Sequence, residues 1–242
     1  MTSKRIYLSL FLIYLLSCSK NNSSPAPTPG TNCKITAASI VSGGGVNLGK
    51  YSFRYNTDGS LAGSTFTGVY TDTVSYKYSG NLIYRSVAAG ANSSVDTVTL
   101  NDAGMAVLDK AQIGKSVYTT NYIYDATGLL QTYTQQQDTF PPVSATYSFT
   151  NGDNTLITNG TAVDTLIYDL NKPAVMGNMD EFSQFLQFGY MYVKNKHLVT
   201  EEHHGTGFVY TYTYTPEGNI STIKIVIGNT NSETISYTYE CQ

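Results

Sequence analysis

Charged side chains are scarce in this sequence: Asp, Glu, Lys and Arg together make up 13% of its 242 residues. No run of Lys or Arg occurs, and because a nucleic-acid-binding surface needs a basic patch or stripe, the composition excludes that class of partner. The longest apolar run, residues 6–16, is too short for a transmembrane helix, which needs about 20 residues. Little charge with abundant Thr, Ser, Asn and Tyr indicates an exported β-protein rather than a cytosolic enzyme.

Recognisable catalytic and metal-binding motifs are also missing. The sequence has no Gly-x-Ser-x-Gly and no Cys-x-x-Cys, the patterns of a serine nucleophile and of a thiolate site. The densest group of candidate ligands, Glu201-Glu202-His203-His204, falls on a predicted strand, where neighbours point to opposite faces. At most one Glu and one His could converge there, fewer than the roughly three or four ligands of a zinc site. Calcium bound by Asp58, Asp102 and Asp125 is an alternative, but turn chemistry already explains these carboxylates. We therefore predict a protein that is not an enzyme and has no metal and no cofactor.

The first residues have the order of a secretory signal peptide, with basic Lys4-Arg5 before the apolar run. The run ends in Leu15-Leu16-Ser17-Cys18, which resembles the lipobox of bacterial lipoproteins. In that family the signal peptide is removed before the Cys, and the thiol then carries a diacylglycerol. The resemblance implies a signal peptide over residues 1–17 and lipidation at Cys18. The alternative is an ordinary secretory signal with an incidental cysteine.

The stretch after the lipobox, residues 18–32, is polar and contains Pro25, Pro27 and Pro29. Such a segment cannot pack a core, so we expect a disordered tether that carries the lipidated Cys18. Without Lys4 and Arg5, 12 basic and 17 acidic side chains remain, a net charge of −5. The expected location is the outer membrane, on its periplasmic face or at the cell surface, with the membrane as a partner through the lipid anchor.

A hairpin motif recurs along the rest of the chain. It reads Tyr-x-Tyr, or a close variant, then a turn ending in Gly, then an aliphatic residue, and its clearest copies are residues 53–61, 122–130 and 212–220. Asn, Asp or Thr at the first turn position and Gly at the fourth are typical of a type I turn followed by a left-handed Gly. The sequence thus predicts a positive φ at four glycines: Gly59, Gly104, Gly128 and Gly218.

The spacing of the turns predicts the architecture. Gly80, Gly104, Gly128 and Gly152 are each 24 residues apart, which is the length of two strands with their turns. Residues 33–242 are therefore predicted to form one all-β domain, an antiparallel up-and-down meander of about 14–16 strands rolled into a barrel-like body.

Two local patterns add detail to this domain. In residues 210–214 every tyrosine faces one side and every threonine the other, as in a sheet with one apolar and one wet face. The tyrosines could form the core, line the barrel, or present a stacking surface for sugars. Asn178 with Glu181 predicts the start of one short helix over residues 178–188, ended by Gly189. This helix would be a packing plug or, alternatively, a gating lid.

The two remaining cysteines, Cys33 and Cys241, lie at the two ends of the predicted sheet. In an oxidising compartment two such thiols are expected to form a disulfide. An even number of strands puts both ends at one rim, and a closed sheet makes them neighbours. The alternative is a pair of unpaired thiols near mobile termini.

Two resemblances follow from these motifs. The tyrosine–aspartate pattern around Asp125 resembles the repeats of Rhs-type shells. The lipobox, the hairpin array, residues 194–198 and the ending 237–241 resemble a family of uncharacterised exported bacterial lipoproteins. That resemblance implies a porin-like, barrel-shaped fold, and it brings no catalytic residues.

The sequence favours a membrane-anchored lipoprotein that acts as a non-enzymatic binding or structural module. The alternative is a protein that binds a glycan or a small apolar ligand in a barrel interior or on a Tyr-rich face. An integral outer-membrane barrel is a third hypothesis, because the predicted strands are long enough to cross a membrane, which takes about 9–11 residues per strand. The apolar faces, however, lack the continuous Leu/Val band that a lipid-facing wall requires.

Overall fold

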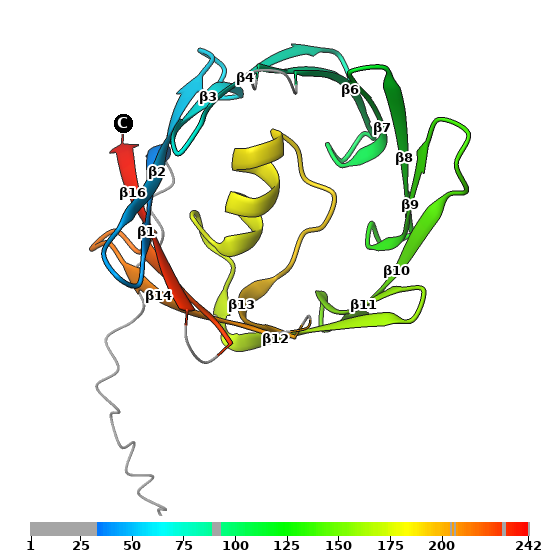
Figure 1. The fold of residues 1–242 in the computed structure, drawn as a ribbon. Helices are drawn as coiled ribbons and strands as arrows, with labels where there is room; N and C mark the ends of the chain where they lie inside the picture. The colour runs from blue at the N-terminus through cyan, green and yellow to red at the C-terminus, as the bar shows by residue number, and fades with distance from the viewer. Residues whose placement is uncertain (1–32, 89–92, 204, 206, 229–230, 242) are drawn as a thin grey trace, which may run out of the picture.

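The computed structural model describes residues 33–88, 93–203, 205, 207–228 and 231–241. Over this part of the chain it is an antiparallel sheet of sixteen strands closed into a barrel, with one short helical segment in its lumen (Figure 1). The predicted all-β meander of about 14–16 strands is confirmed. The described helical residues include no segment long and apolar enough to cross a membrane. The strands are β1 (Cys33–Ser42), β2 (Asn47–Tyr55), β3 (Leu61–Gly68), β4 (Thr71–Ser79), β5 (Leu82–Ala88), β6 (Ser94–Leu100), β7 (Ala106–Ile113), β8 (Ser116–Tyr124), β9 (Leu130–Gln137), β10 (Val143–Thr150), β11 (Asp153–Asn159), β12 (Ala162–Pro173), β13 (His197–His203), β14 (Phe208–Tyr214), β15 (Ile220–Ile227) and β16 (Asn231–Cys241).

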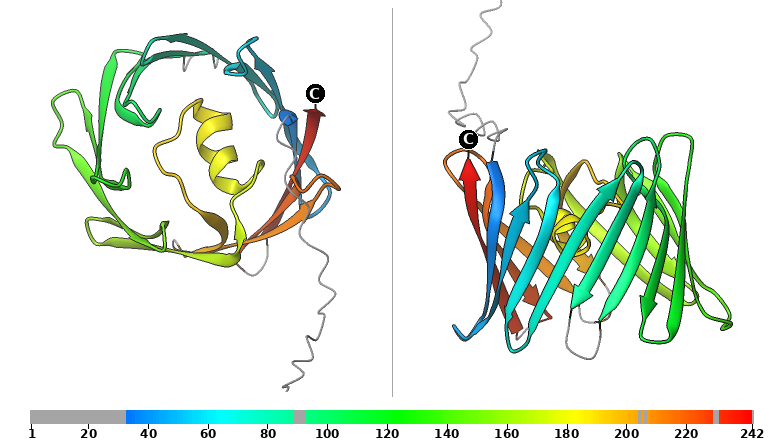
Figure 2. Two further views of the ribbon diagram at one scale, coloured as in Figure 1. Left: turned by 180° about the vertical axis from the view of Figure 1, so that it is seen from behind. Right: turned by 90° about the horizontal axis from the view of Figure 1, so that it is seen from above.

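The barrel closes where its first strand pairs with its last. The β1–β16 ladder runs from Cys33 opposite Cys241 to Ser42 opposite Glu233. Cys33 and Cys241 form a disulfide at the end of this ladder, with their Cα atoms 3.9 Å apart. Because the strand number is even, both cysteines lie at one rim, which we call the terminal rim; the opposite rim is the far rim (Figure 2).

Tight glycine turns join the strands at the terminal rim. Gly59, Gly104, Gly128 and Gly218 have φ values of +89°, +74°, +84° and +88°, so the predicted left-handed conformation is confirmed at all four. In the turn after β8, the Asp125 carboxylate accepts hydrogen bonds from the backbone N–H groups of turn residues 127 and 129. The turn carboxylate thus stabilises its own turn, which is the role that the sequence pattern predicted for it.

The two faces of the wall differ in chemistry. Along β14, Tyr210 is buried and Tyr212 half-buried on the lumen side, whereas Thr211 and Thr213 are exposed on the outside. The outer Thr213 hydroxyl lies 2.7 Å from those of Ser221 and Thr222 on the next strand. Tyrosines line the lumen on about half of the strands, as one of the sequence hypotheses proposed, and short hydroxylated side chains cover much of the outside.

A segment between β12 and β13, residues 174–196, enters the lumen from the terminal rim and returns to it (Figures 1 and 2). We call this segment the plug. Its centre is the π-helix η2 (Glu181–Leu186), with helical residues on both sides over 179–188. The predicted helix is therefore present, and it lies inside the barrel. The Asn178 side chain accepts a hydrogen bond from the Glu181 N–H at 2.8 Å, and Gly189 follows the helix with a φ of +80°.

The plug bonds to strands on several sides of the wall. Backbone N–H groups of Ala106 and Ile220, at the starts of β7 and β15, donate to plug carbonyls at 3.1 Å. Tyr76 on β4 and Tyr124 on β8 donate their hydroxyls to plug carbonyls at 3.1 and 3.2 Å. Because buried carbonyls without donors are costly, these wall donors fix the position of the plug in the lumen.

A buried glutamine gives the plug its compact shape. The Gln184 amide nitrogen donates to the Val193 carbonyl at 3.1 Å. The amide oxygen of the same side chain accepts from the backbone N–H groups of Tyr192 and Val193. Gln184 thus replaces the missing ladder between the two halves of the plug, a role that the sequence pattern did not reveal.

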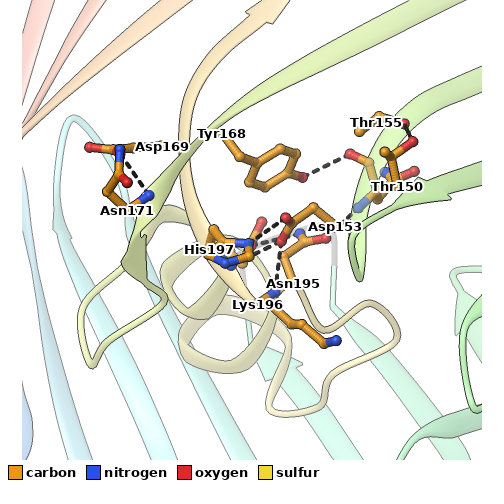
Figure 3. Close-up of polar contacts among 11 residues, drawn as sticks. Thr150, Asp153, Thr155, Tyr168, Asp169, Asn171, Asn195, Lys196 and His197 are labelled. Carbon is orange, nitrogen blue, oxygen red and sulfur yellow. Dashed lines mark hydrogen bonds and ion pairs between the residues drawn. The ribbon is translucent and has the colours of Figure 1, made fainter. Parts of the chain in front are cut away.

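Asp153, at the start of β11, holds the point where the plug rejoins the wall (Figure 3). One oxygen of its carboxylate accepts from the N–H groups of Lys196 and His197 at 2.8 and 2.9 Å, and the other lies 2.6 Å from His197 Nδ1. Asp153 is only 1% exposed. Next to it, the Asn195 side chain accepts the Asn154 N–H at 2.7 Å. One carboxylate therefore satisfies three donors at the base of the plug.

We predict that Asp153→Asn lowers the free energy of unfolding by about 2–4 kcal/mol, because it removes a charged acceptor from three donors and turns an amide group toward them. Urea unfolding followed by circular dichroism measures this change. Asp169→Asn is the matched control, since Asp169 makes a partly exposed ion pair with Lys172 at 3.5 Å, and such pairs contribute at most about 1 kcal/mol. Equal effects of the two variants would contradict the anchoring role of Asp153.

Candidate ligand-binding site in the barrel lumen

The histidine and glutamate cluster of the sequence does not converge on a metal. Glu202 points into the lumen and accepts the Tyr210 hydroxyl at 2.9 Å, whereas Glu201 pairs with His203 at 3.1 Å. His204 and Cys18 lie outside the described residues. Within the described ranges, no three His, Cys, Asp or Glu side chains are placed to hold a metal ion.

A cavity of about 450 Å³ lies in the lumen beside the plug. Its wall comes from strands β5 to β9, and its inner end is formed by Phe188, Tyr190 and Tyr192 of the plug. Ser94 and Ile113, which are the far-rim ends of β6 and β7, also line it. The cavity thus extends from the plug toward the far rim, and its volume is that of a small-molecule pocket. We call it the lumen pocket.

Three ionisable side chains face one another in the lumen pocket. Arg85 on β5 forms an ion pair with Asp96 on β6, its direct cross-strand partner. On the next strand, Asp109 accepts the hydroxyl of Tyr190 from the plug at 3.0 Å. Burial is the main cause that raises the pKa of Asp109, the Tyr190 hydrogen bond and Arg85 lower it, Asp96 adds to the rise, and the net pKa is about 6. The pocket therefore contains a carboxyl group that changes charge close to neutral pH.

Each of these three side chains keeps one polar atom without a hydrogen bond to the described part of the protein. The atoms are Arg85 Nε, Asp96 Oδ1 and Asp109 Oδ1, and all three are buried. Asp96 as a whole is only 2% exposed. Buried polar atoms in folded proteins nearly always have partners, so these atoms indicate a site that is completed by something other than the wall.

Aromatic rings supply the remaining wall of the lumen pocket. The ring of Tyr122 stacks on that of Tyr192 with centroids 5.4 Å apart and meets the edge of Tyr133 at 5.8 Å. The guanidinium of Arg85 lies 5.6 Å from the ring centroid of Phe188. Aromatic walls around a few fixed polar groups are typical of small-molecule binding sites. The arrangement can bind and orient a ligand, and it presents no activated nucleophile.

The sequence analysis missed the polar residues of this site. None of the sequence motifs pointed to Arg85, Asp96, Asp109 or Tyr190 as a site. A signal was nevertheless present, because Arg85 lies between Ile83 and Val87 in the inward-facing register of β5. A charge at an apolar register position is a candidate functional residue, but its partners come from other strands and from the plug.

Comparison with known proteins supports the fold. No protein-family model and no curated protein matches the chain. Among solved structures, a porin-like protein from Bacteroides uniformis is similar, with a TM-score of 0.60, 17% sequence identity, and 85% of this chain and 98% of that chain covered. A porin-like protein from Bacteroides vulgatus has a TM-score of 0.57 and 15% identity over the same shares. At such identities the likeness shows the barrel fold alone, so membership of a lipoprotein family and a relation to Rhs-type repeats stay predictions.

Proposed function

We propose that this protein is an exported, membrane-tethered binding module that takes a small ligand in the lumen pocket without transforming it. The observation that carries this proposal is the lumen pocket itself, in which aromatic rings surround three polar side chains that each keep one buried atom without a partner. The clustering of three such atoms at one cavity favours a ligand over a purely structural lumen, because each unpaired buried atom costs stability. A glycan remains a candidate ligand alongside other small molecules, since aromatic walls also stack on sugar rings.

The geometry of the barrel suits a tethered receptor. Residues 1–32 join the body at Cys33, on the terminal rim, which is also the rim where the plug enters. The lumen pocket extends toward the opposite rim. A lipid at Cys18 would therefore hold the terminal rim toward the membrane and leave the mouth of the pocket directed away from it, where solutes arrive.

The outer wall favours a tethered body over an integral barrel. On the ladder between β14 and β15, the outward pairs include Thr211 with Lys224 and Thr213 with Thr222. On the ladder between β9 and β10, the exposed Thr134 and Ser144 hydroxyls lie 3.0 Å apart. A lipid-facing wall needs an apolar band about 25 Å tall. Charged and hydroxylated pairs in the middle of outward faces support a wall that contacts water.

We predict that the Cys18→Ser variant of the full-length chain leaves the membrane fraction or remains unprocessed, and that labelling with radioactive palmitate disappears. The reason is that the anchor would be the lipid alone. Membrane fractionation and labelling in cells measure both effects. Ser24→Ala in the same cells is the control, because it changes a residue of the predicted tether that lies outside the lipobox. Normal processing with unchanged membrane retention of Cys18→Ser would contradict the tether.

The lumen pocket can be tested with a fluorescent reporter, because the chain contains no tryptophan. We predict that Phe188→Trp, which places the only indole at the inner end of the pocket, changes its emission with at least one class among neutral oligosaccharides, small amines and small organic acids. The matched control is Val209→Trp on the outer wall, whose emission should not change. Adding Ala111→Phe to the reporter should weaken the response at least about tenfold, because a ring would occupy the pocket.

The outcome against this proposal is equally specific. If no compound changes the Phe188→Trp emission beyond the Val209→Trp control at millimolar concentration, the lumen is not a ligand site. A response that persists unchanged in the Ala111→Phe background would also exclude the lumen pocket as the place of binding.

A further inference from the structure

We propose that the lumen pocket takes a small organic cation, a primary ammonium on an apolar body, and holds the ammonium between Asp109 and Asp96. This inference rests on the proposed function and names the class of its ligand. It follows from three independent properties of the pocket: its charge, the kind of polar atoms left without partners, and the chemistry of its wall.

The charge of the pocket is unbalanced. Arg85 pairs with Asp96, so the positive charge of the guanidinium is already matched. Asp109 accepts the neutral hydroxyl of Tyr190, and the nearest cation, Arg85, is shared with Asp96, so two carboxylates face one positive charge. A carboxylate away from bulk water is unfavourable unless a positive charge accompanies it. A bound cation supplies that charge, whereas an anionic ligand would meet two carboxylates.

The atoms without partners match a ligand rich in donors. Asp96 Oδ1 and Asp109 Oδ1 are both acceptors, while Arg85 Nε is the single donor among the three. A primary ammonium has three N–H donors and no acceptor. It can therefore bond to both carboxylates at once, and charge-assisted hydrogen bonds of this kind are the stronger ones.

The wall of the pocket suits both parts of such a ligand. On one side of the pocket, the ring of Tyr122 contacts the rings of both Tyr133 and Tyr192. Aromatic faces carry a negative quadrupole that attracts a cation, and the same rings offer apolar surface to a hydrocarbon body. A cavity of about 450 Å³ has room for a small primary amine together with its apolar group.

A sugar would use the same rings, but its affinity would depend differently on pH. The titratable groups around Asp109 are Arg85 on β5, Asp96 on β6, Tyr122 on β8, Tyr133 on β9 and Tyr190 on the plug. Since burial raises the pKa of Asp109 to about 6, this carboxyl is largely neutral at pH 5 and largely ionised at pH 7.5. An ammonium binds the ionised form, so its affinity should rise about tenfold over this interval. A neutral sugar gains no charge pairing from that ionisation.

The test compares benzylamine with benzyl alcohol, which are similar in shape and differ in charge, by titration calorimetry on the full-length chain. We expect benzylamine to bind at pH 7.5 at least about tenfold more tightly than benzyl alcohol, and about tenfold more weakly at pH 5. Asp109→Asn should remove both the preference for the amine and its pH dependence. Glu202→Gln is the matched control, because Glu202 also faces the lumen and accepts a tyrosine hydroxyl, at 2.9 Å, but does not line the lumen pocket. This variant should leave the preference for the amine and its pH dependence unchanged.

The possible results separate this inference from the proposed function. Equal affinity for the amine and the alcohol, or benzylamine binding that is the same at pH 5 and pH 7.5, would overturn the cation assignment even if Asp109→Asn does not fold. A neutral oligosaccharide that changes the Phe188→Trp emission where benzylamine does not would overturn the ligand class and leave the proposed function intact. If no compound of any class binds in the lumen pocket, both proposals fail.

Discussion

Closure of the sheet between β1 and β16 is the constraint on which the rest of this structure depends. It pairs Cys33 with Cys241 at the end of the chain's longest-range ladder and gives the wall an inside and an outside. In an open sheet the tyrosine rows would face water, and the edges of β1 and β16 would expose unpaired backbone groups. Once the sheet closes, the same rows become a lumen, and the disulfide fixes the closing ladder at one end, which limits the freedom of the unfolded chain.

The size of the barrel explains the plug and the pocket. About eight strands make a barrel that its own side chains can fill, whereas about 16–18 leave an open channel. With sixteen strands, this protein needs additional chain to cover its inner aromatic wall, and residues 174–196 provide it. The ring of Phe188 and the hydroxyl of Tyr190 meet the wall beside Arg85 and Asp109. The plug leaves the space beyond them unfilled, so the same segment that stabilises the lumen also forms the inner end of the lumen pocket.

Much of the fold could be predicted from the sequence because its determinants are local. Turn glycines such as Gly104 and Gly128 and the alternation of Tyr and Thr along β14 each specify conformation within a few residues. The regular spacing of these turns predicts the meander, and the two terminal cysteines predict its closure. The helix followed from Asn178 and Gly189 in the same way, but its place inside the barrel did not, because Gln184 and Asp153 determine that place through partners on distant segments.

The candidate site could not be predicted because its residues come from separate parts of the chain. Arg85 and Asp96 meet across one ladder, Asp109 lies on the next strand, and Tyr190 arrives from the plug 81 residues later. No short sequence motif contains two of these residues, so no motif indicates how they lie relative to one another. The one local signal was a charge in an inward-facing register, and its meaning required knowing that the inward face encloses a lumen.

The central claim is that β1 and β16 close the wall, and amide hydrogen exchange of the folded protein tests it most directly. Every backbone N–H of these strands that faces the closing ladder should exchange as slowly as the amides of β8 and β9, which lie within the wall far from the seam. Fast exchange of the β1 and β16 amides on the seam side, with slow exchange on their other side, would show two free edges. That result would contradict the closed barrel and, with it, the lumen and its pocket.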